Sequence, residues 1–134
     1  DEEFDMIKQH PTIGHEILVP VEPLRYVLDG VLHHHENFDG TGYPHGLAGL
    51  EIPLDARILA VADAFDAMTS DRPYRDGMPA AKAQAILTDG SGSQWDPDIV
   101  EAFFASIDKV QAVSACQEDS NTLVESIVPT LAGQ

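Results

Sequence analysis

Apolar residues recur along most of this chain at the spacing of an α-helix, in which positions i, i+3, i+4 and i+7 share one face. Two stretches show the pattern clearly. The first stripe is formed by Leu24, Val27, Leu28, Val31 and Leu32. The second stripe, in a helix predicted over residues 56–69, is formed by Ile58, Val61, Ala62, Phe65 and Met68. No stretch alternates apolar and polar residues as a strand would, so the sequence predicts an all-α fold.

Prolines and glycines divide this helical pattern into shorter pieces. A short helix is predicted over Glu2–Gln9, and Pro11 interrupts it because proline lacks the N–H that an interior turn needs. Pro11 can instead take the first position of a new helix that runs through Leu18. Between Asn37 and Pro53 the chain holds four glycines and two prolines, a composition that indicates a loop.

The later part of the chain contains two more predicted helices. The first covers residues 79–87, and Gly90 can end it in a left-handed conformation. Asp96 is a suitable N-cap for the second, which covers residues 97–107. Beyond this helix the pattern is weak, so the last stretch either forms one more helix or lacks fixed structure.

Length and composition are those of a single globular domain. The chain has 134 residues, of which 43% are hydrophobic. No apolar run approaches the ~20 residues that span a bilayer, and no signal-peptide pattern opens the chain. The single cysteine, Cys116, cannot form an internal disulfide, which fits a reducing compartment. We therefore expect a cytoplasmic protein with no membrane partner in this segment.

Acidic residues dominate the charge of the chain. Lysine and arginine together number 7, against 23 aspartate and glutamate residues, which gives a formal net charge of −16. A surface of this kind repels the backbones of DNA and RNA and anionic lipid, so nucleic acid is not an expected partner. A small anionic ligand is compatible with it if metal ions and a few arginines reverse the sign locally.

Histidines and one aspartate at separate points of the chain are candidate metal ligands. They are His10, His34, His35 and Asp63. Imidazole and carboxylate together suit first-row metals such as Fe, Mn or Zn. Neighbouring helix positions are rotated by about 100°. Three consecutive histidines therefore cannot all face one ion, whereas two of them can face two adjacent ions.

These residues belong to longer motifs that follow one another along the chain. The segment HHENFDGTGYPHGL occupies residues 34–47, and HPTIG begins upstream at His10. Downstream come the segments IP at 52–53, ARI at 56–58, VAD at 61–63 and FDAMTSDRPYR at 65–75. In this order and spacing, residues 1–105 resemble the HD-GYP family of bacterial cyclic di-GMP phosphodiesterases.

The resemblance implies a helical bundle of the HD-domain type and metal-dependent hydrolysis of cyclic di-GMP to the linear dinucleotide or GMP. The implied cofactor is a divalent transition metal, Fe or Mn, with two or three ions in the intact domain. By their positions in the motifs, the implied metal ligands are His10, His34, His35 and Asp63. His33 then becomes an extra residue rather than a ligand.

The resemblance also implies residues that contact the substrate. Tyr43, in the motif Gly42-Tyr43-Pro44, is expected to line the pocket and to meet a guanine or a ribose. Arg72 and Arg75 are expected to meet the phosphates, because a guanidinium fork matches phosphate oxygens. These two arginines are among only seven basic residues in a strongly acidic chain.

One departure concerns the residue pair that gives the family part of its name. No His-Asp dipeptide occurs in this chain, and the family places that pair, with an associated histidine and lysine, upstream of the motif that begins at His10. We therefore expect the N-terminal helices of the bundle to be absent. Residues 1–109 are then the C-terminal portion of an HD-GYP-like domain, residues 110–134 are a tail, and the 134 residues alone are expected to be inactive.

Two alternatives to a cyclic di-GMP phosphodiesterase remain. The chain can be a non-catalytic module that binds a cyclic dinucleotide, or that docks a protein partner on its Gly-Tyr-Pro loop. It can also be part of an HD-superfamily phosphohydrolase that acts on another nucleotide. Whichever function applies, apolar surface left without its upstream helices favours association into a homodimer.

Overall fold

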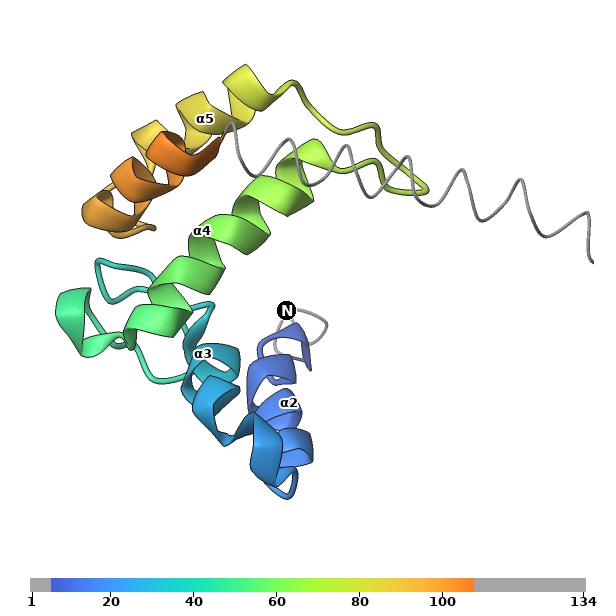
Figure 1. Ribbon diagram of the computed structural model, residues 1–134, viewed down its shortest axis with the longest axis vertical. Helices are drawn as coiled ribbons and strands as arrows, with labels where there is room; N and C mark the ends of the chain where they lie inside the picture. Colours follow the sequence, from blue (N-terminus) through green and yellow to red (C-terminus); the bar gives the residue numbers. More distant parts are fainter. Residues whose placement is uncertain (1–5, 108–134) are drawn as a thin grey trace, which may run out of the picture. The chain divides into compact units, whose positions relative to one another are not determined.

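The structure, a computed structural model, describes residues 6–107 of the chain (Figure 1). Its regular elements are, in chain order, α2 (His10–Leu18), the 3-10 helix η1 (Glu22–Val27), α3 (Leu28–His33), the 3-10 helix η2 (Gly49–Glu51), α4 (Leu54–Thr69) and α5 (Ala80–Asp89). Residues 97–107 are also helical. Between residues 6 and 107 there is no strand, only two isolated β-bridges, so the predicted all-α fold is confirmed.

The chain divides into two compact units, residues 1–102 and residues 103–134. The first unit contains every element from α2 to α5. Of the second unit only residues 103–107 are described, and they are helical. The predicted tail, residues 110–134, lies outside the described residues. None of the described helices is long and apolar enough to cross a membrane.

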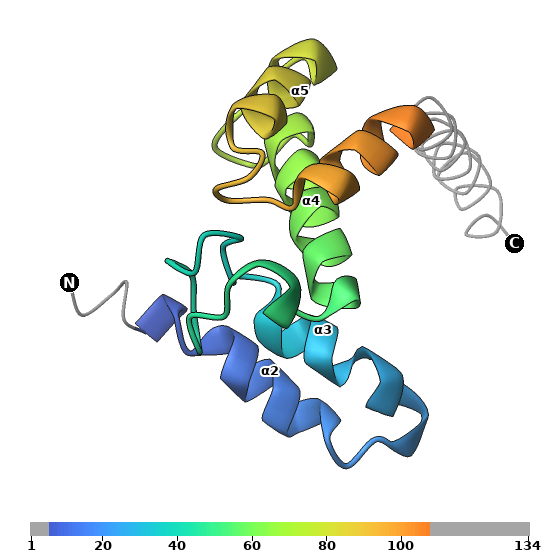
Figure 2. The ribbon, with the colours of Figure 1, turned by 90° about the vertical axis from the view of Figure 1, so that its left-hand side faces the viewer.

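α4 is the longest of the named helices and contributes much of the core of the first unit. Its buried residues are Ala56, Val61 and Phe65, whereas Ile58 and Ala62 of the predicted stripe are exposed. The buried face is therefore rotated from the predicted one, because both α3 and α5 pack against α4 (Figure 2). α3 also packs against α2. α4, which carries the candidate ligand Asp63, thus lies against α3, which ends at His33.

The amphipathic helix predicted over residues 24–32 is divided into two elements. η1 is a 3-10 helix, and α3 begins only at Leu28. Pro23 lies in the first turn of η1 and supplies no N–H, and the tighter 3-10 turn is common at helix starts. Of the helix predicted over residues 2–9, residues 6–7 are helical, and residues 1–5 lie outside the described part.

Gly90 ends α5, but the prediction of a left-handed conformation is wrong. Its φ is −85°, in the right-handed region. A Cβ at this position would collide with the indole ring of Trp95, which is only 6% exposed. The glycine is therefore required by close packing of a buried side chain rather than by backbone conformation.

Asp96 caps the helical stretch that begins after it, as predicted. Its Oδ1 accepts a hydrogen bond from the N–H of Asp98 at 2.9 Å. Its Oδ2 pairs with Nη1 of Arg57 at 2.5 Å, and Arg57 also donates its Nε–H to the carbonyl of Ile52 at 2.9 Å. Both charged groups are largely buried, so this pair ties the first turns of α4 to the segment that follows α5.

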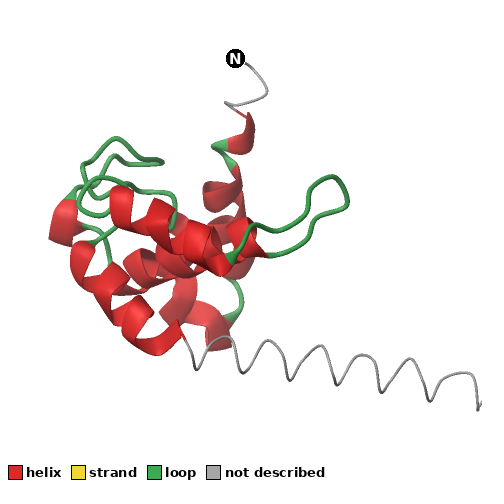
Figure 3. Ribbon diagram, turned by 90° about the horizontal axis from the view of Figure 1, so that it is seen from above, coloured by secondary structure: helices red, strands yellow, loops and turns green. Residues whose placement is uncertain are grey.

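The loop between α3 and η2, one of the green segments in Figure 3, is organised by Glu36. This residue is 3% exposed, and its two carboxylate oxygens accept the main-chain N–H groups of His45 at 2.7 Å and Leu47 at 3.1 Å. The peptide bond between Tyr43 and Pro44 is cis. A Cβ on Gly42 would collide with the backbone of Glu36, so the loop can fold back on itself here only with glycine.

Two further features hold this loop in place. Gly40 and Gly46 adopt φ values of 84° and 69°, in the region that favours glycine. The main-chain N–H groups of Phe38 and Asp39 donate to the carbonyls of residues 94 and 93, at 3.2 and 2.8 Å. The loop is therefore anchored both at the end of α3 and on the segment after α5.

Candidate metal centre

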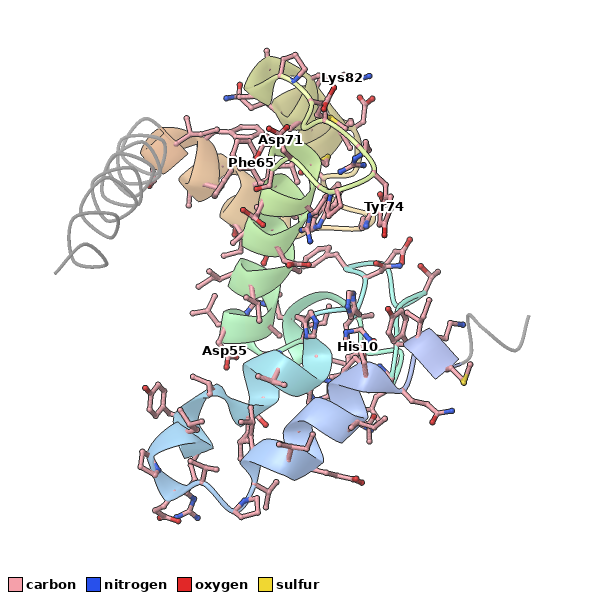
Figure 4. All side chains as sticks on the ribbon, turned by 90° about the vertical axis from the view of Figure 1, so that its right-hand side faces the viewer. His10, Asp55, Phe65, Asp71, Tyr74 and Lys82 are labelled. Carbon is pink, nitrogen blue, oxygen red and sulfur yellow. The ribbon has the colours of Figure 1, made fainter. Side chains whose placement is uncertain are left out.

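Three histidines from two neighbouring helical segments converge in the first unit. His10 begins α2, His34 follows the last residue of α3, and His35 comes next. One ligand nitrogen of each lies within 4.8 Å of the others, and the Nε2 atoms of His10 and His35 are 3.0 Å apart. Figure 4 labels His10 at the start of α2, beside the loop. The structure therefore brings together three of the four side chains that the sequence proposed as ligands.

Asp63, the fourth candidate, does not belong to this close group. It is exposed on α4 and lines the same cavity as His34 and His35. The negative charge of Asp63 raises the pKa of His35, but burial and the charges of His34 and His10 lower it by more. His33 also lies outside the group of His10, His34 and His35. Its ring is beside that of His45, with the two centroids 5.1 Å apart.

Hydrogen bonds to the main chain determine which nitrogen two of these histidines present. The Nδ1–H of His10 donates to the carbonyl of Ile7 at 2.6 Å, and the Nδ1–H of His34 donates to the carbonyl of Val31 at 2.8 Å. A carbonyl oxygen can only accept, so Nδ1 must carry the proton in both rings. In the neutral rings Nε2 is then left with a free lone pair, which is the form that binds metal ions.

His35 completes the group as a neutral imidazole. Burial, together with the positive charges of His34 and His10, lowers its pKa to about 4, and the negative charge of Asp63 opposes these effects. His35 is therefore uncharged at neutral pH. In the neutral form of His10, Nε2 is an acceptor, and the Nε2–H of His35 then donates across the 3.0 Å between them. A metal ion shared by both nitrogens requires this proton to leave Nε2 of His35.

A cavity of about 470 Å³ opens beside the histidines. Its wall includes His34, His35, Tyr43, Asp63, Lys8 and Trp95. The ring of Tyr43 stacks on that of His35, with centroids 5.0 Å apart and planes inclined by 21°. Burial raises the pKa of Tyr43, so its phenol stays protonated and can donate a hydrogen bond.

Sequence reasoning did not single out Lys8 as a functional residue. Its Nζ lies 5.9 Å from the centroid of the Tyr43 ring, and it forms part of the cavity wall. The available signal was its rarity, because it is one of seven basic residues and stands two positions before His10. Lys8 supplies positive charge beside the acidic residues of the cavity.

Arg72 and Arg75 are not in the cavity wall. Their main chains form a β-bridge, with N–H to carbonyl distances of 2.8 and 3.0 Å. Nη2 of Arg72 lies 3.7 Å from Oδ2 of Asp66, and Nη2 of Arg75 donates to the carbonyl of Ala67. Both side chains thus reach back to the last turns of α4, about one turn beyond Asp63.

Taken together, these side chains can bind a divalent transition metal ion. Three imidazoles, two of them with Nδ1 bonded to a main-chain carbonyl, bring ligand nitrogens within 4.8 Å of one another, and a carboxylate stands in the same cavity. Nitrogen and oxygen ligands of this kind suit Fe, Mn or Zn. The open cavity leaves room for a small molecule next to such an ion.

The comparisons with known sequences agree on one family. A model of the HD domain family matches residues 1–99. A cyclic di-GMP phosphodiesterase of Vibrio cholerae is 42% identical over 127 residues, covering 90% of this chain and 26% of that protein. A cyclic di-GMP phosphodiesterase of Thermotoga maritima is also 42% identical, over 125 residues, covering 90% of this chain and 33% of that protein. The 3′3′-cGAMP-specific phosphodiesterase 3 of V. cholerae is 39% identical over 100 residues, with 75% and 22% covered.

A solved structure has a similar fold. The crystal structure of a cyclic GMP-AMP specific phosphodiesterase of V. cholerae has a TM-score of 0.64 and 25% identity to this chain. The alignment covers 82% of this chain and 25% of that one. The chain thus spans about a quarter to a third of the length of these two cyclic di-GMP phosphodiesterases and of the protein in the crystal structure.

Proposed function

The chain belongs to the HD domain family, and from this premise we propose that it is part of a metal-dependent phosphodiesterase that hydrolyses cyclic di-GMP. The observation that carries the proposal is the convergence of His10, His34 and His35 beside an open cavity. The names of the V. cholerae and T. maritima relatives support the substrate. The expected products are the linear dinucleotide or GMP.

We assign His10, His34 and His35 as ligands of Fe or Mn, with Asp63 as a carboxylate ligand from α4. The donor set fits this assignment, because neutral imidazole and carboxylate both suit these metals. Two or three ions are proposed for the intact domain. When bound, the metal ions polarise the phosphodiester and lower the pKa of a water molecule, which makes hydroxide available as the nucleophile.

The other assigned residues bind and orient the substrate. Tyr43, held by its stacking on His35, contacts a guanine or a ribose from the wall of the cavity. Arg72 and Arg75 contact the phosphates, for which Arg72 exchanges its partner Asp66 for a phosphate oxygen. That exchange costs little, because the Arg72–Asp66 pair is more than half exposed and exposed pairs contribute only about 0–1 kcal/mol.

A second substrate is favoured by one observation. Relatives at 39% identity are named as 3′3′-cGAMP-specific phosphodiesterases, so hydrolysis of another cyclic dinucleotide is the competing proposal. It uses the same histidines and cavity and differs only in one base of the substrate. A direct comparison of the two substrates separates the two proposals.

The metal assignment is tested by anaerobic titration of the 134-residue chain with Mn²⁺ or Fe²⁺. We expect His34→Ala to weaken metal binding by at least about tenfold, since loss of a partner outside the ligand shell already costs about 10–100-fold. His15→Ala is the matched control, because it removes a histidine outside the cluster. Equal metal affinity of the two variants would contradict the assignment.

Hydrolysis of cyclic di-GMP and of 3′3′-cGAMP is measured on the complete gene product and on the 134-residue chain, both loaded with Mn²⁺ or Fe²⁺. The complete product should hydrolyse one of them. The 134-residue chain should show essentially no turnover, because its four candidate ligands are too few for a multinuclear centre. If the 134-residue chain hydrolyses the substrate at a rate comparable to that of the complete product, no further ligands are needed and this prediction is wrong.

Four statements about the wider protein stay predictions: a cytoplasmic location, a domain that occupies residues 1–109, a protein partner at the Gly-Tyr-Pro loop, and a homodimer. The homodimer has some support from exposed apolar side chains. On α2, Ile13 and Ile17 are 49% and 66% exposed, and Tyr26 in η1 is 80% exposed. Measurement of the mass in solution tests this prediction.

A further inference from the structure

His33 is a buried side chain without a hydrogen-bond partner. It is 9% exposed, and its Nδ1 makes no hydrogen bond within the described part of the chain. His33 does not belong to the group formed by His10, His34 and His35. A buried polar atom left unpaired costs free energy, and such an atom in a folded protein calls for an explanation.

A carboxylate oxygen of Glu36 lies close to this nitrogen. Nδ1 of His33 lies 3.6 Å from Oε1 of Glu36. This distance exceeds the ~2.7–3.2 Å of an N–H···O hydrogen bond. It is close to the spacing of two ligands on a tetrahedral metal ion, which is about 3.4 Å for bonds of ~2.0–2.1 Å.

His45 supplies a third ligand from the loop. One ligand atom from each of His33, Glu36 and His45 lies within 4.8 Å of the others, and the two imidazole rings are 5.1 Å apart. His33 and Glu36 are buried, whereas His45 is exposed, so the group is open to solvent on the side of His45. Oε1 of Glu36 accepts one main-chain N–H, from His45, and keeps a lone pair for another partner.

We propose that His33, Glu36 and His45 form a second metal-ion site for Zn²⁺ or another divalent transition metal, separate from the cluster of His10, His34 and His35. Two imidazoles, one carboxylate and an open position for water are a known ligand set for zinc. The site joins the end of α3 to the loop that carries the Gly-Tyr-Pro motif. An ion bound there stabilises the loop in its observed position, and this inference does not depend on the proposed phosphodiesterase activity.

The test is a titration of the purified chain with Zn²⁺, and with Co²⁺ to follow the visible absorption of the bound ion. His45→Ala should remove one class of sites, or weaken it by at least about tenfold, and leave the other class unchanged. His10→Ala should have the opposite effect, and His15→Ala should leave both classes in place. The side chain of His45 is exposed, and Glu36 binds its main-chain N–H, so the substitution leaves the anchoring hydrogen bond intact.

Each outcome decides the proposal. If His45→Ala and His45→Gln, checked for folding by circular dichroism, bind Zn²⁺ and Co²⁺ with the number and affinity of the unsubstituted chain, the site does not exist. His33 and Glu36 would then form an ion pair or share a water molecule. If His10→Ala binds metal normally while His45→Ala does not, the second site stands and the first assignment fails. Loss of one class in each variant supports both sites independently.

Discussion

Several side chains at and beside the candidate metal centre are oriented by hydrogen bonds to main-chain atoms of their own or the following segment. His10 and His34 each donate Nδ1–H to a carbonyl three residues earlier. Glu36 uses both carboxylate oxygens to bind main-chain N–H groups of the loop. The orientation of each group therefore depends on the backbone of its own segment rather than on other flexible side chains, which favours a fixed arrangement of ligands.

Asp39 shows the same kind of local control and allows a test by pH. Its Oδ1 accepts the Oγ1–H of Thr41 at 2.6 Å and the main-chain N–H of Thr41 at 2.9 Å, and these bonds, the side-chain bond first, lower the pKa of Asp39 from 3.8. A carboxyl group with a lowered pKa contributes stability above its unfolded pKa and loses it as pH falls through the folded pKa. The Thr41 amide shift, followed by NMR, should therefore titrate with a midpoint below 3.8.

Thr41→Ala is the matching variant for this titration. It removes the side-chain hydrogen bond and keeps the main-chain one, so the midpoint at residue 41 should move up toward 3.8. Asp39→Asn should abolish the transition at residue 41. A midpoint that is the same in the unsubstituted chain and in Thr41→Ala would show that the hydrogen bond from Oγ1 does not control this carboxyl group.

At the scale of elements, the loop after α3 brings Tyr43 to the histidines. Its path requires close contact of its own backbone at Gly42 and positive φ at Gly40 and Gly46. Main-chain hydrogen bonds join it to residues 93–94, and Glu36 fixes its other side. The loop is therefore anchored on both sides of its path, although its composition resembles that of a flexible turn.

Gly42→Ala tests the close contact in this loop. The added methyl group collides with the backbone of Glu36, and overpacking of this kind typically lowers the free energy of unfolding by about 1–3 kcal/mol. Gly14→Ala, in α2, is the control, because its Cβ would lie 3.4 Å from Cγ1 of Val31, an ordinary contact. We expect that control to be neutral or to stabilise by up to about 1 kcal/mol. Urea unfolding measures both, and equal effects would contradict the prediction.

Much of the secondary structure can be predicted from the sequence, and the rest depends on packing between segments. The helix over 56–69 and the cap at Asp96 were predicted because helical periodicity and capping are local properties. The division of residues 24–32 into η1 and α3, and the true reason for Gly90, depend on contacts between segments. The sequence pattern contains no information on these contacts.

The same distinction applies to the candidate site. His10, His34 and His35 could be chosen from their motifs, and the structure brings them together. Their tautomers, the position of Asp63 outside the close group and the presence of Lys8 in the cavity wall could not be predicted. Each of these depends on distances of a few ångströms between residues far apart in the sequence.

At the scale of the whole first unit, one buried ion pair joins early and late parts of the chain. Arg57 on α4 and Asp96 after α5 have side chains that are 14% and 3% exposed. Asp96→Ala would leave the guanidinium of Arg57 buried without its counter-charge and would remove the N-cap. Loss of one partner of a buried pair typically costs about 3–5 kcal/mol of unfolding free energy.

The control for this substitution is an exposed pair elsewhere in the chain. Arg25 and Glu22 lie 2.7 Å apart with side chains 68% and 78% exposed, so Arg25→Ala should cost at most about 1 kcal/mol. Denaturant unfolding of both variants, followed by circular dichroism, gives the comparison. A loss at Asp96 no larger than that at Arg25 would show that the buried pair does not hold the unit together.

The hydrogen bonds that orient His10 and His34 also bear on when the cluster forms. The atoms of these hydrogen bonds, and of the contact between His10 and His35, all belong to residues 7–35. Their arrangement requires only that α2 pack on α3. Contacts between segments so close in sequence require less loop-closure entropy than contacts between distant segments, which favours their early formation. The histidine cluster can thus assemble on the helical hairpin before α4 and α5 have docked. A metal ion captured at that stage would favour the folded hairpin by mass action, so metal supply during synthesis would influence the yield of native protein.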